Sequence, residues 1–244
     1  MRNIKLTIRY DGTAYAGWQT QSNARTIQET LEKAIGSVTG EKASLIASGR
    51  TDAGVHAEAQ VANFRTCTAL PLKNIRQAVN SRLPKDIVIS RIEKCAPRFN
   101  ARHDAKSKTY RYILANGDSV DPFMRHYAAK CFYSLNIRSM RQAARHLMGR
   151  HDFSAFRSVD GRCADPVRKI KRIRIEKEGK LVYIYMEADS FLYNMARAIV
   201  GTLVEAGRGK IRPGYVKEIL RKKERGFCGP TAPAKGLCLV RVRY

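Results

Sequence analysis

The order of strand and helix signals in the first hundred residues constrains the fold more than any other feature of this sequence. Alternating polar and apolar residues predict strands, and apolar residues spaced by three and four predict amphipathic helices. The predicted strands span 5–10, 43–48, 60–65 and 86–92, and the predicted helices span 27–38 and 72–83. This β-α-β-β-α-β order is typical of ferredoxin-like modules, in which two helices cover one face of an antiparallel sheet.

The second half of the chain carries a similar mixture of elements. A strand at 109–114 would place Tyr110 and Tyr112 on one face and Arg111 on the other. The remaining predictions are a helix capped by Asn136, a hairpin of 166–177 with 181–188, helices at 191–206 and from Pro213, and a strand at 236–244. We therefore predict an α+β fold of two related halves, with an N-terminal domain at 1–104 and a C-terminal domain at 105–244.

The charge of the chain indicates a polyanionic partner. The 244 residues include 46 Lys and Arg against 21 Asp and Glu, which gives a formal net charge of +25. Residues 1–104 hold 16 basic and 9 acidic side chains, and residues 105–244 hold 30 and 12. Nucleic acid is the commonest partner of so basic a protein, and the second half is the more basic one.

Other classes of site and location find little support in the sequence. The six cysteines, at 67, 95, 131, 163, 228 and 238, form no CxxC pair, and the histidines show no HxxxH or HExxH arrangement. No apolar run is long enough to span a membrane, and the N-terminus lacks the apolar stretch of a signal peptide. We predict a cytoplasmic protein without a metal, a cofactor or a membrane partner.

The loop from Ser48 to Ala57, SGRTDAGVHA, sets a single carboxylate between two glycines. Gly49 and Gly54 can adopt positive φ angles and let another backbone or a ligand approach Asp52 closely. An aspartate in a glycine-rich loop after a strand is also typical of an ordinary turn. The loop by itself therefore leaves both a catalytic and a structural role open.

Arg197 is the only charged residue between Asp189 and Glu205, in a stretch predicted to be an apolar helix. Burying an unpaired charge is costly, so this guanidinium needs an anionic partner or a solvated cleft. The alternative is that its aliphatic chain is long enough to bring the charge to the protein surface. Asp52 is one candidate partner. A neighbouring guanidinium would lower the pKa of Asp52 and keep the carboxylate ionised.

Two aromatic side chains could contact a nucleic acid base. Tyr110 fits either a core position or a cleft in which it stacks on an extruded base or passes a proton through its hydroxyl. Trp18, in the loop YAGWQ, is the only tryptophan. It fits either base stacking or packing as the anchor of its own loop.

Several motifs of the chain resemble those of one family. YAGWQ, SGRTDAGVHA, RFNARHDAKSKTYRY, HDFSAF, FLYNMARAIVG and APAKGLCLVRVRY occur in this order, from about Tyr10 to Tyr244. Together they resemble the tRNA pseudouridine synthase A family, and no motif position departs from the family pattern. The resemblance implies the pseudouridine synthase fold, in which two α+β domains join their antiparallel sheets across a basic cleft, and a homodimer.

The resemblance also implies an isomerase that converts uridine to pseudouridine in the anticodon arm of tRNA, at positions 38, 39 and 40. The N1–C1′ bond breaks, the uracil rotates, and C5 joins C1′. Asp52 resembles the catalytic carboxylate, which could attack C1′, add to the pyrimidine ring or remove a ribose proton. Arg50 resembles the arginine that helps hold the place of the flipped nucleotide, Arg197 the partner of the aspartate, and Tyr110 the tyrosine that stacks on the uracil.

Two other functions would also account for parts of the sequence. A non-catalytic RNA-binding protein of two ferredoxin-like modules explains the charge and the fold equally well. It gives no reason for the Asp52 loop or for Arg197, and it calls for aromatic RNA-binding motifs that the strands lack. A glycoside or nucleoside hydrolase would need a second carboxylate at a comparable loop, and Asp52 has no obvious acidic companion.

Overall fold

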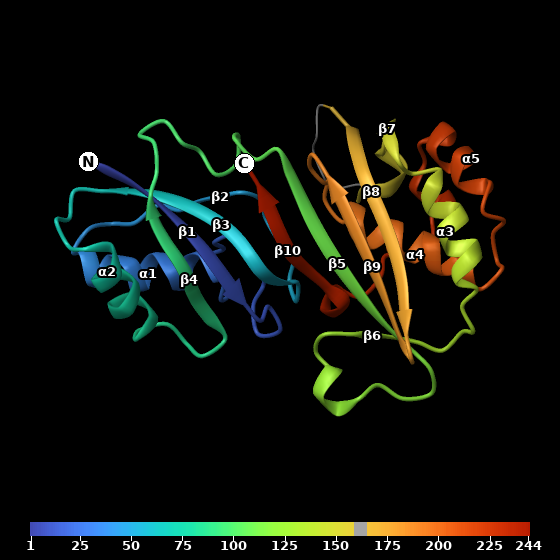
Figure 1. Ribbon diagram of the computed structural model, residues 1–244, viewed down its shortest axis with the longest axis horizontal. Coiled ribbons are helices and arrows are strands. Elements are labelled where there is room, and N and C mark those ends of the chain that lie inside the picture. Colours follow the sequence, from blue (N-terminus) through green and yellow to red (C-terminus); the bar gives the residue numbers. More distant parts are fainter. Residues whose placement is uncertain (159–164) are drawn as a thin grey trace. The chain divides into compact units, whose positions relative to one another are not determined.

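The computed structural model describes residues 1–158 and 165–244, which form two compact units (Figure 1). Unit 1 comprises Met1–Lys106 and Cys238–Tyr244, and unit 2 comprises Ser107–Leu237. Both units combine helices with a sheet, so the predicted α+β class is confirmed. Cys163 and part of the arginine-containing loop after Phe156 lie outside the described residues.

Unit 1 is built around the strand order β4-β1-β3, in which β1 pairs antiparallel with both neighbours. Its strands are β1 (Arg2–Tyr10), β2 (Ile46–Ala47), β3 (His56–Thr66), β4 (Ile87–Lys94) and β10 (Leu237–Arg243), and its helices are α1 (Ile27–Thr39) and α2 (Leu72–Asn80). The two helices contact each other and lie on the same side of the sheet (Figure 1). The predicted β-α-β-β-α-β order is therefore confirmed.

Two strands share one edge of β3, because β2 is too short to cover it. The second strand is β10, which lies near the C-terminus of the chain. β2 pairs antiparallel with β3 at Ala62 and Asn63. β10 pairs with β3 in parallel at His56 and Ala57. This parallel pair differs from the antiparallel pairing that was predicted. Because no hairpin connects β10 to β3, the two strands are free to run in the same direction.

Unit 2 is built around the strand order β5-β9-β8-β7, with antiparallel pairs along this path. β6 adds to β5 in parallel, which is the second departure from the predicted antiparallel pairing. Its strands are β5 (Ser107–Asn116), β6 (Ala129–Cys131), β7 (Gly149–Asp152), β8 (Val167–Glu178) and β9 (Leu181–Ala188). Its helices are α3 (Ile137–Arg145), α4 (Met195–Gly207) and α5 (Tyr215–Lys222), with 3-10 turns at Pro122–Met124, Ser154–Phe156, Arg225–Phe227 and Ala234–Gly236.

The predicted helix starts are confirmed at α1 and α3. The Thr26 hydroxyl accepts a hydrogen bond from the N–H of Glu29 at 3.4 Å, and the Asn136 side chain accepts one from the N–H of Ser139 at 3.1 Å. Both contacts satisfy an N–H group that has no partner inside its helix. At the other end of α1, Gly40 takes the left-handed conformation, with a φ of 71°.

α4 begins four residues later than the apolar pattern predicts, at Met195 instead of Phe191. Asn194 adopts a φ of 60°, which stops the helix from extending toward its N-terminus. Further along α4, a Cβ on Gly201 would lie 1.7 Å from the carbonyl oxygen of Pro230. The backbone of the segment around Pro230 therefore packs directly on this helix.

Candidate active site

Asp52 begins a four-residue turn between β2 and β3. The N–H of Val55 donates to the carbonyl oxygen of Asp52 at 3.1 Å, and Gly54 has a φ of 75°. A positive φ at the third position of such a turn favours glycine over residues with a Cβ. Asp52 is half-buried, and Arg50 on the same loop is exposed. The turn thus holds the carboxylate in a defined and partly accessible position.

The loop that follows β1 holds this turn on both sides of Asp52. On one side, the N–H of Trp18 donates to the carbonyl oxygen of Thr51 at 3.0 Å. On the other side, the N–H of Gly54 donates to the carbonyl oxygen of Tyr15 at 3.3 Å. The backbone around Asp52 is therefore fixed by one neighbouring segment of the chain.

Two glycines allow these two backbones to approach each other. A Cβ on Gly12 would lie 2.1 Å from the carbonyl oxygen of Val55, and one on Gly17 would lie 2.6 Å from that of Thr51. Both distances are far too short for a real side chain. Gly17 also has a φ of 91°, which a residue with a side chain rarely adopts.

Trp18 packs as the anchor of its own loop, which confirms one of its two sequence interpretations. Its side chain is 1% exposed, and its ring centroid lies 6.1 Å from that of Tyr10. The Tyr10 hydroxyl lies 2.8 Å from the Thr51 hydroxyl oxygen. Because burial raises the pKa of Tyr10, its hydroxyl keeps its proton and supports this contact beside Asp52.

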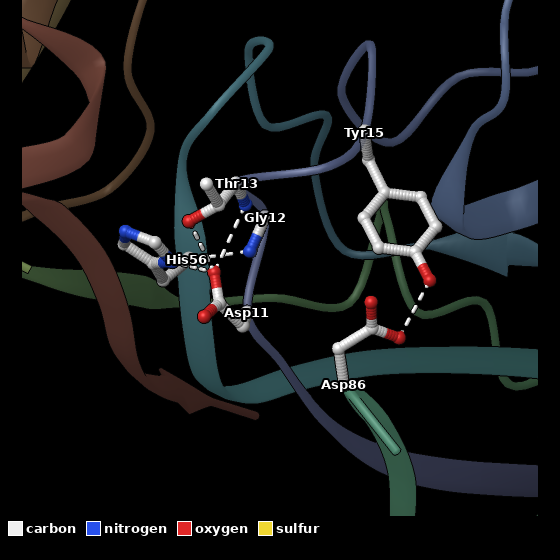
Figure 2. Close-up of polar contacts among 6 residues, drawn as sticks. All are labelled: Asp11, Gly12, Thr13, Tyr15, His56 and Asp86. Atoms are coloured by element: carbon white, nitrogen blue, oxygen red, sulfur yellow. Dashed lines mark hydrogen bonds and ion pairs between the residues drawn. The ribbon is translucent and has the colours of Figure 1, made fainter. Parts of the chain in front are cut away.

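Figure 2 shows further polar contacts that fix the same loop. The Tyr15 hydroxyl donates to Asp86 Oδ1 at 2.6 Å, and burial together with this carboxylate raises the pKa of Tyr15. On the other side, Asp11 Oδ1 accepts from the N–H of Thr13 at 2.9 Å and from its hydroxyl at 2.6 Å, beside the ring of His56. The sequence pattern alone does not mark these residues as part of the site. The Asp-Gly pair after β1 and the histidine inside the SGRTDAGVHA loop were the available signals.

In unit 2, Tyr110 lies on the face of β5 that it shares with Tyr112, as predicted. Tyr110 is 7% exposed, and its ring packs edge to face against Phe191, with centroids 5.0 Å apart and planes at 88°. The Tyr112 hydroxyl donates to the carbonyl oxygen of Pro233 at 2.7 Å. Tyr110 therefore lines the buried face of its strand, next to the segment that leads into α4.

Arg197 lies in the first turn of α4, half-buried, and its guanidinium is fixed by two oxygens. Nε donates to the carbonyl oxygen of Ala232 at 2.7 Å, and Nη1 donates to Asn194 Oδ1 at 2.7 Å. The N–H of Ala232 donates back to the carbonyl oxygen of Arg197 at 3.2 Å. These contacts argue against a solvated arginine that merely extends to the surface. Asp52 belongs to unit 1 and Arg197 to unit 2.

Within residues 1–158 and 165–244, no group of three His, Cys, Asp or Glu side chains is arranged to hold a metal ion. The cysteines of these ranges are free thiols, at 67, 95, 131, 228 and 238. No helix of the described chain has both the length and the apolar composition needed to cross a membrane.

Comparisons with known proteins bear on this arrangement. A family described as tRNA pseudouridine synthase matches residues 6–104 and 143–244, which include Asp52 and Arg197 but not Tyr110. The chain is 48% identical to tRNA pseudouridine synthase A 2 of Clostridium perfringens and 47% identical to tRNA pseudouridine synthase A of Acetivibrio thermocellus. Each alignment covers 100% of both chains.

Among solved structures, a chain from the crystal structure of a Cbf5-Nop10-Gar1 complex is similar, with a TM-score of 0.40 and 10% identity. That match covers 97% of this chain and 58% of the other. The family match and the full-length relatives both extend over the glycine-bordered loop of Asp52 and the apolar helix of Arg197. The chain therefore belongs to the tRNA pseudouridine synthase family, whose enzymes are isomerases that act on uridine in tRNA.

Proposed function

We propose that this protein converts uridine to pseudouridine at positions 38, 39 and 40 of the tRNA anticodon arm, with Asp52 as the catalytic carboxylate. The observation that supports Asp52 most directly is its turn, which is held on both sides and leaves the carboxylate partly accessible. Geometry that is fixed before the substrate arrives is what positions a reacting group efficiently. We expect the enzyme to work in the cytoplasm, where its proposed substrate is found.

Three further residues are proposed to bind the substrate. Arg50, exposed on the Asp52 loop, would help keep the flipped nucleotide out of the helical stack. Tyr110 would stack on the uracil, and Arg197 would pair with Asp52. Extruding a paired base costs a few kcal/mol, and a chain with a net charge of +25 can offset this through contacts to phosphates.

Mapping pseudouridine in tRNA from cells with and without this protein tests the proposed target. We expect pseudouridine to disappear at positions 38, 39 and 40 and to persist elsewhere in the same tRNAs. Purified protein should restore it in unmodified transcripts, except where the uridine is replaced by cytidine. Loss at other positions would overturn the assignment to the anticodon arm. Binding of tRNA with no pseudouridine formed at all would favour the RNA-binding alternative.

We also propose that the protein is a homodimer that associates through residues 117–135 of unit 2. This segment exposes four aromatic side chains, Phe123 (86%), Phe132 (73%), Tyr133 (46%) and Tyr127 (40%). Its two acidic and two basic residues cancel, whereas the whole chain carries +25. Two copies of so basic a chain repel each other least across a neutral face, and aromatic residues are enriched in protein interfaces.

A double variant, Phe123→Ser with Phe132→Ser, is expected to weaken the dimer at least tenfold, because buried aromatic side chains often dominate interface energies. Analytical ultracentrifugation over a concentration series measures the change. Val88→Ser, which removes an apolar side chain of unit 1 that is 42% exposed, is the matched control and should leave the dimer intact. A wild-type monomer, or a double variant that associates like the wild type, would contradict this proposal.

A further inference from the structure

We infer that His56 is a positioning residue for Asp52 and holds the catalytic turn through the backbone of Gly12. The inference rests on the proposed catalytic role of Asp52. His56 is the first residue of β3, four positions after Asp52, and is 5% exposed. A side chain this deeply buried needs partners for its polar atoms, and it supplies one for a backbone group in return.

The central contact is a buried hydrogen bond from a backbone donor to the imidazole. The N–H of Gly12 donates to Nδ1 of His56 across 3.0 Å (Figure 2). An imidazole nitrogen that accepts a hydrogen bond carries a lone pair, so we assign the proton of the neutral ring to Nε2. Asp11 Oδ1 lies 3.1 Å from the same Nδ1. The contact to Gly12 thus uses Nδ1 as its acceptor.

Gly12 transmits this contact to the turn. Its Cα lies so close to the turn that an added Cβ would be 2.1 Å from the carbonyl oxygen of Val55. The N–H of Val55 in turn donates to the carbonyl oxygen of Asp52 at 3.1 Å. The path from the His56 ring to Asp52 thus consists of one side-chain hydrogen bond, one tight backbone contact and one turn hydrogen bond.

A second path from the same glycine reaches the turn. The carbonyl oxygen of Gly12 accepts from the N–H of Tyr15 at 3.0 Å, and the carbonyl oxygen of Tyr15 accepts from the N–H of Gly54 at 3.3 Å. Gly12 therefore fixes both residues that follow Ala53 in the turn. Displacing Gly12 would move Asp52 without removing any group that touches the substrate, and a shift of about 1 Å at a reacting group can cost about 100-fold in rate.

Three substitutions of His56 separate this role from simple packing. In His56→Asn, the side-chain carbonyl oxygen can take the place of Nδ1 and accept from Gly12. In His56→Gln, the amide lies one atom further out and corresponds to Nε2. His56→Ala removes the polar atoms at both the Nδ1 and the Nε2 positions. We expect Asn to keep kcat within about threefold of the wild type, and Gln and Ala to lower it about 10- to 100-fold, with KM for tRNA nearly unchanged in each.

Gly12→Ala tests the same path from the other side. Its Cβ would push against Val55 while the imidazole stays intact, so kcat should fall as in His56→Ala at an unchanged KM. Thermal melts of all four variants show whether each is folded at the assay temperature. Equal kcat for Asn and Gln, or a wild-type kcat for Ala, would overturn the inference. Full activity of Asp52→Asn would instead refute the catalytic role of Asp52, so the two failures are distinguishable.

Discussion

Replacing Asp52 by asparagine is expected to lower the rate of pseudouridine formation by at least about 10⁴-fold while tRNA affinity stays within about tenfold. The amide fills the space of the carboxylate but carries no charge and is a poor nucleophile and base. The turn should survive, because the substitution keeps the backbone hydrogen bonds made by Thr51, Gly54 and Val55. Single-turnover conversion of an unmodified tRNA transcript measures the rate, and filter binding measures the affinity.

Glu93→Gln is the matched control for this substitution. Glu93 lies on β4 of the same unit and pairs with Lys5 at 2.8 Å, a contact that holds the pKa of the carboxyl below its ordinary value. The control therefore removes one negative charge from unit 1 without touching the loop, and should keep the rate within about threefold. If Asp52→Asn retained the wild-type rate, another group would have to perform the chemistry.

The sequence predicts local structure well where a few neighbouring residues determine it. The capping residues Thr26 and Asn136 begin helices as expected, because each cap contact spans only three positions. The start of α4 was predicted too early, since an apolar run does not reveal that Asn194 takes a left-handed conformation. The pairing of β10 with β3 was not predicted because it joins residues about 180 positions apart, which periodicity cannot register.

In the candidate site, too, the sequence predicts what a local pattern marks and misses contacts between distant segments. The Asp52 loop stood out because two glycines and a carboxylate lie together in sequence. The contacts that hold it were missed because they are mostly backbone hydrogen bonds, which leave little trace in residue identity. The exceptions are Gly12 and Gly17, where the close approach of another backbone excludes any side chain. Burial settled the role of Trp18, which the sequence had left open.

Arg197→Lys is expected to lower the single-turnover rate about 100-fold. The guanidinium presents five N–H donors in a planar fork, and the structure directs Nε to the Ala232 carbonyl oxygen and Nη1 to Asn194 Oδ1. A lysine ammonium is a point charge that cannot keep both contacts and also face a carboxylate. Arg141→Lys is the control, since the Nε and Nη2 atoms of Arg141 both donate to the Ile175 carbonyl oxygen. Arg141→Lys loses a comparable pair of guanidinium contacts, and its single-turnover rate should stay close to that of the wild type.

A double-mutant cycle then tests whether Arg197 acts through Asp52 or only through the segment at Ala232. Unfolding free energies are measured for the wild type, Asp52→Asn, Arg197→Lys and the double variant. A direct pair predicts a coupling energy of about 1–3 kcal/mol, because each single change leaves the other partner with an uncompensated group. A purely structural arginine predicts additive effects within about 0.5 kcal/mol. Additivity together with a slow Arg197→Lys variant would assign the rate loss to displacement of the Ala232 segment, and the proposed pairing with Asp52 would be wrong.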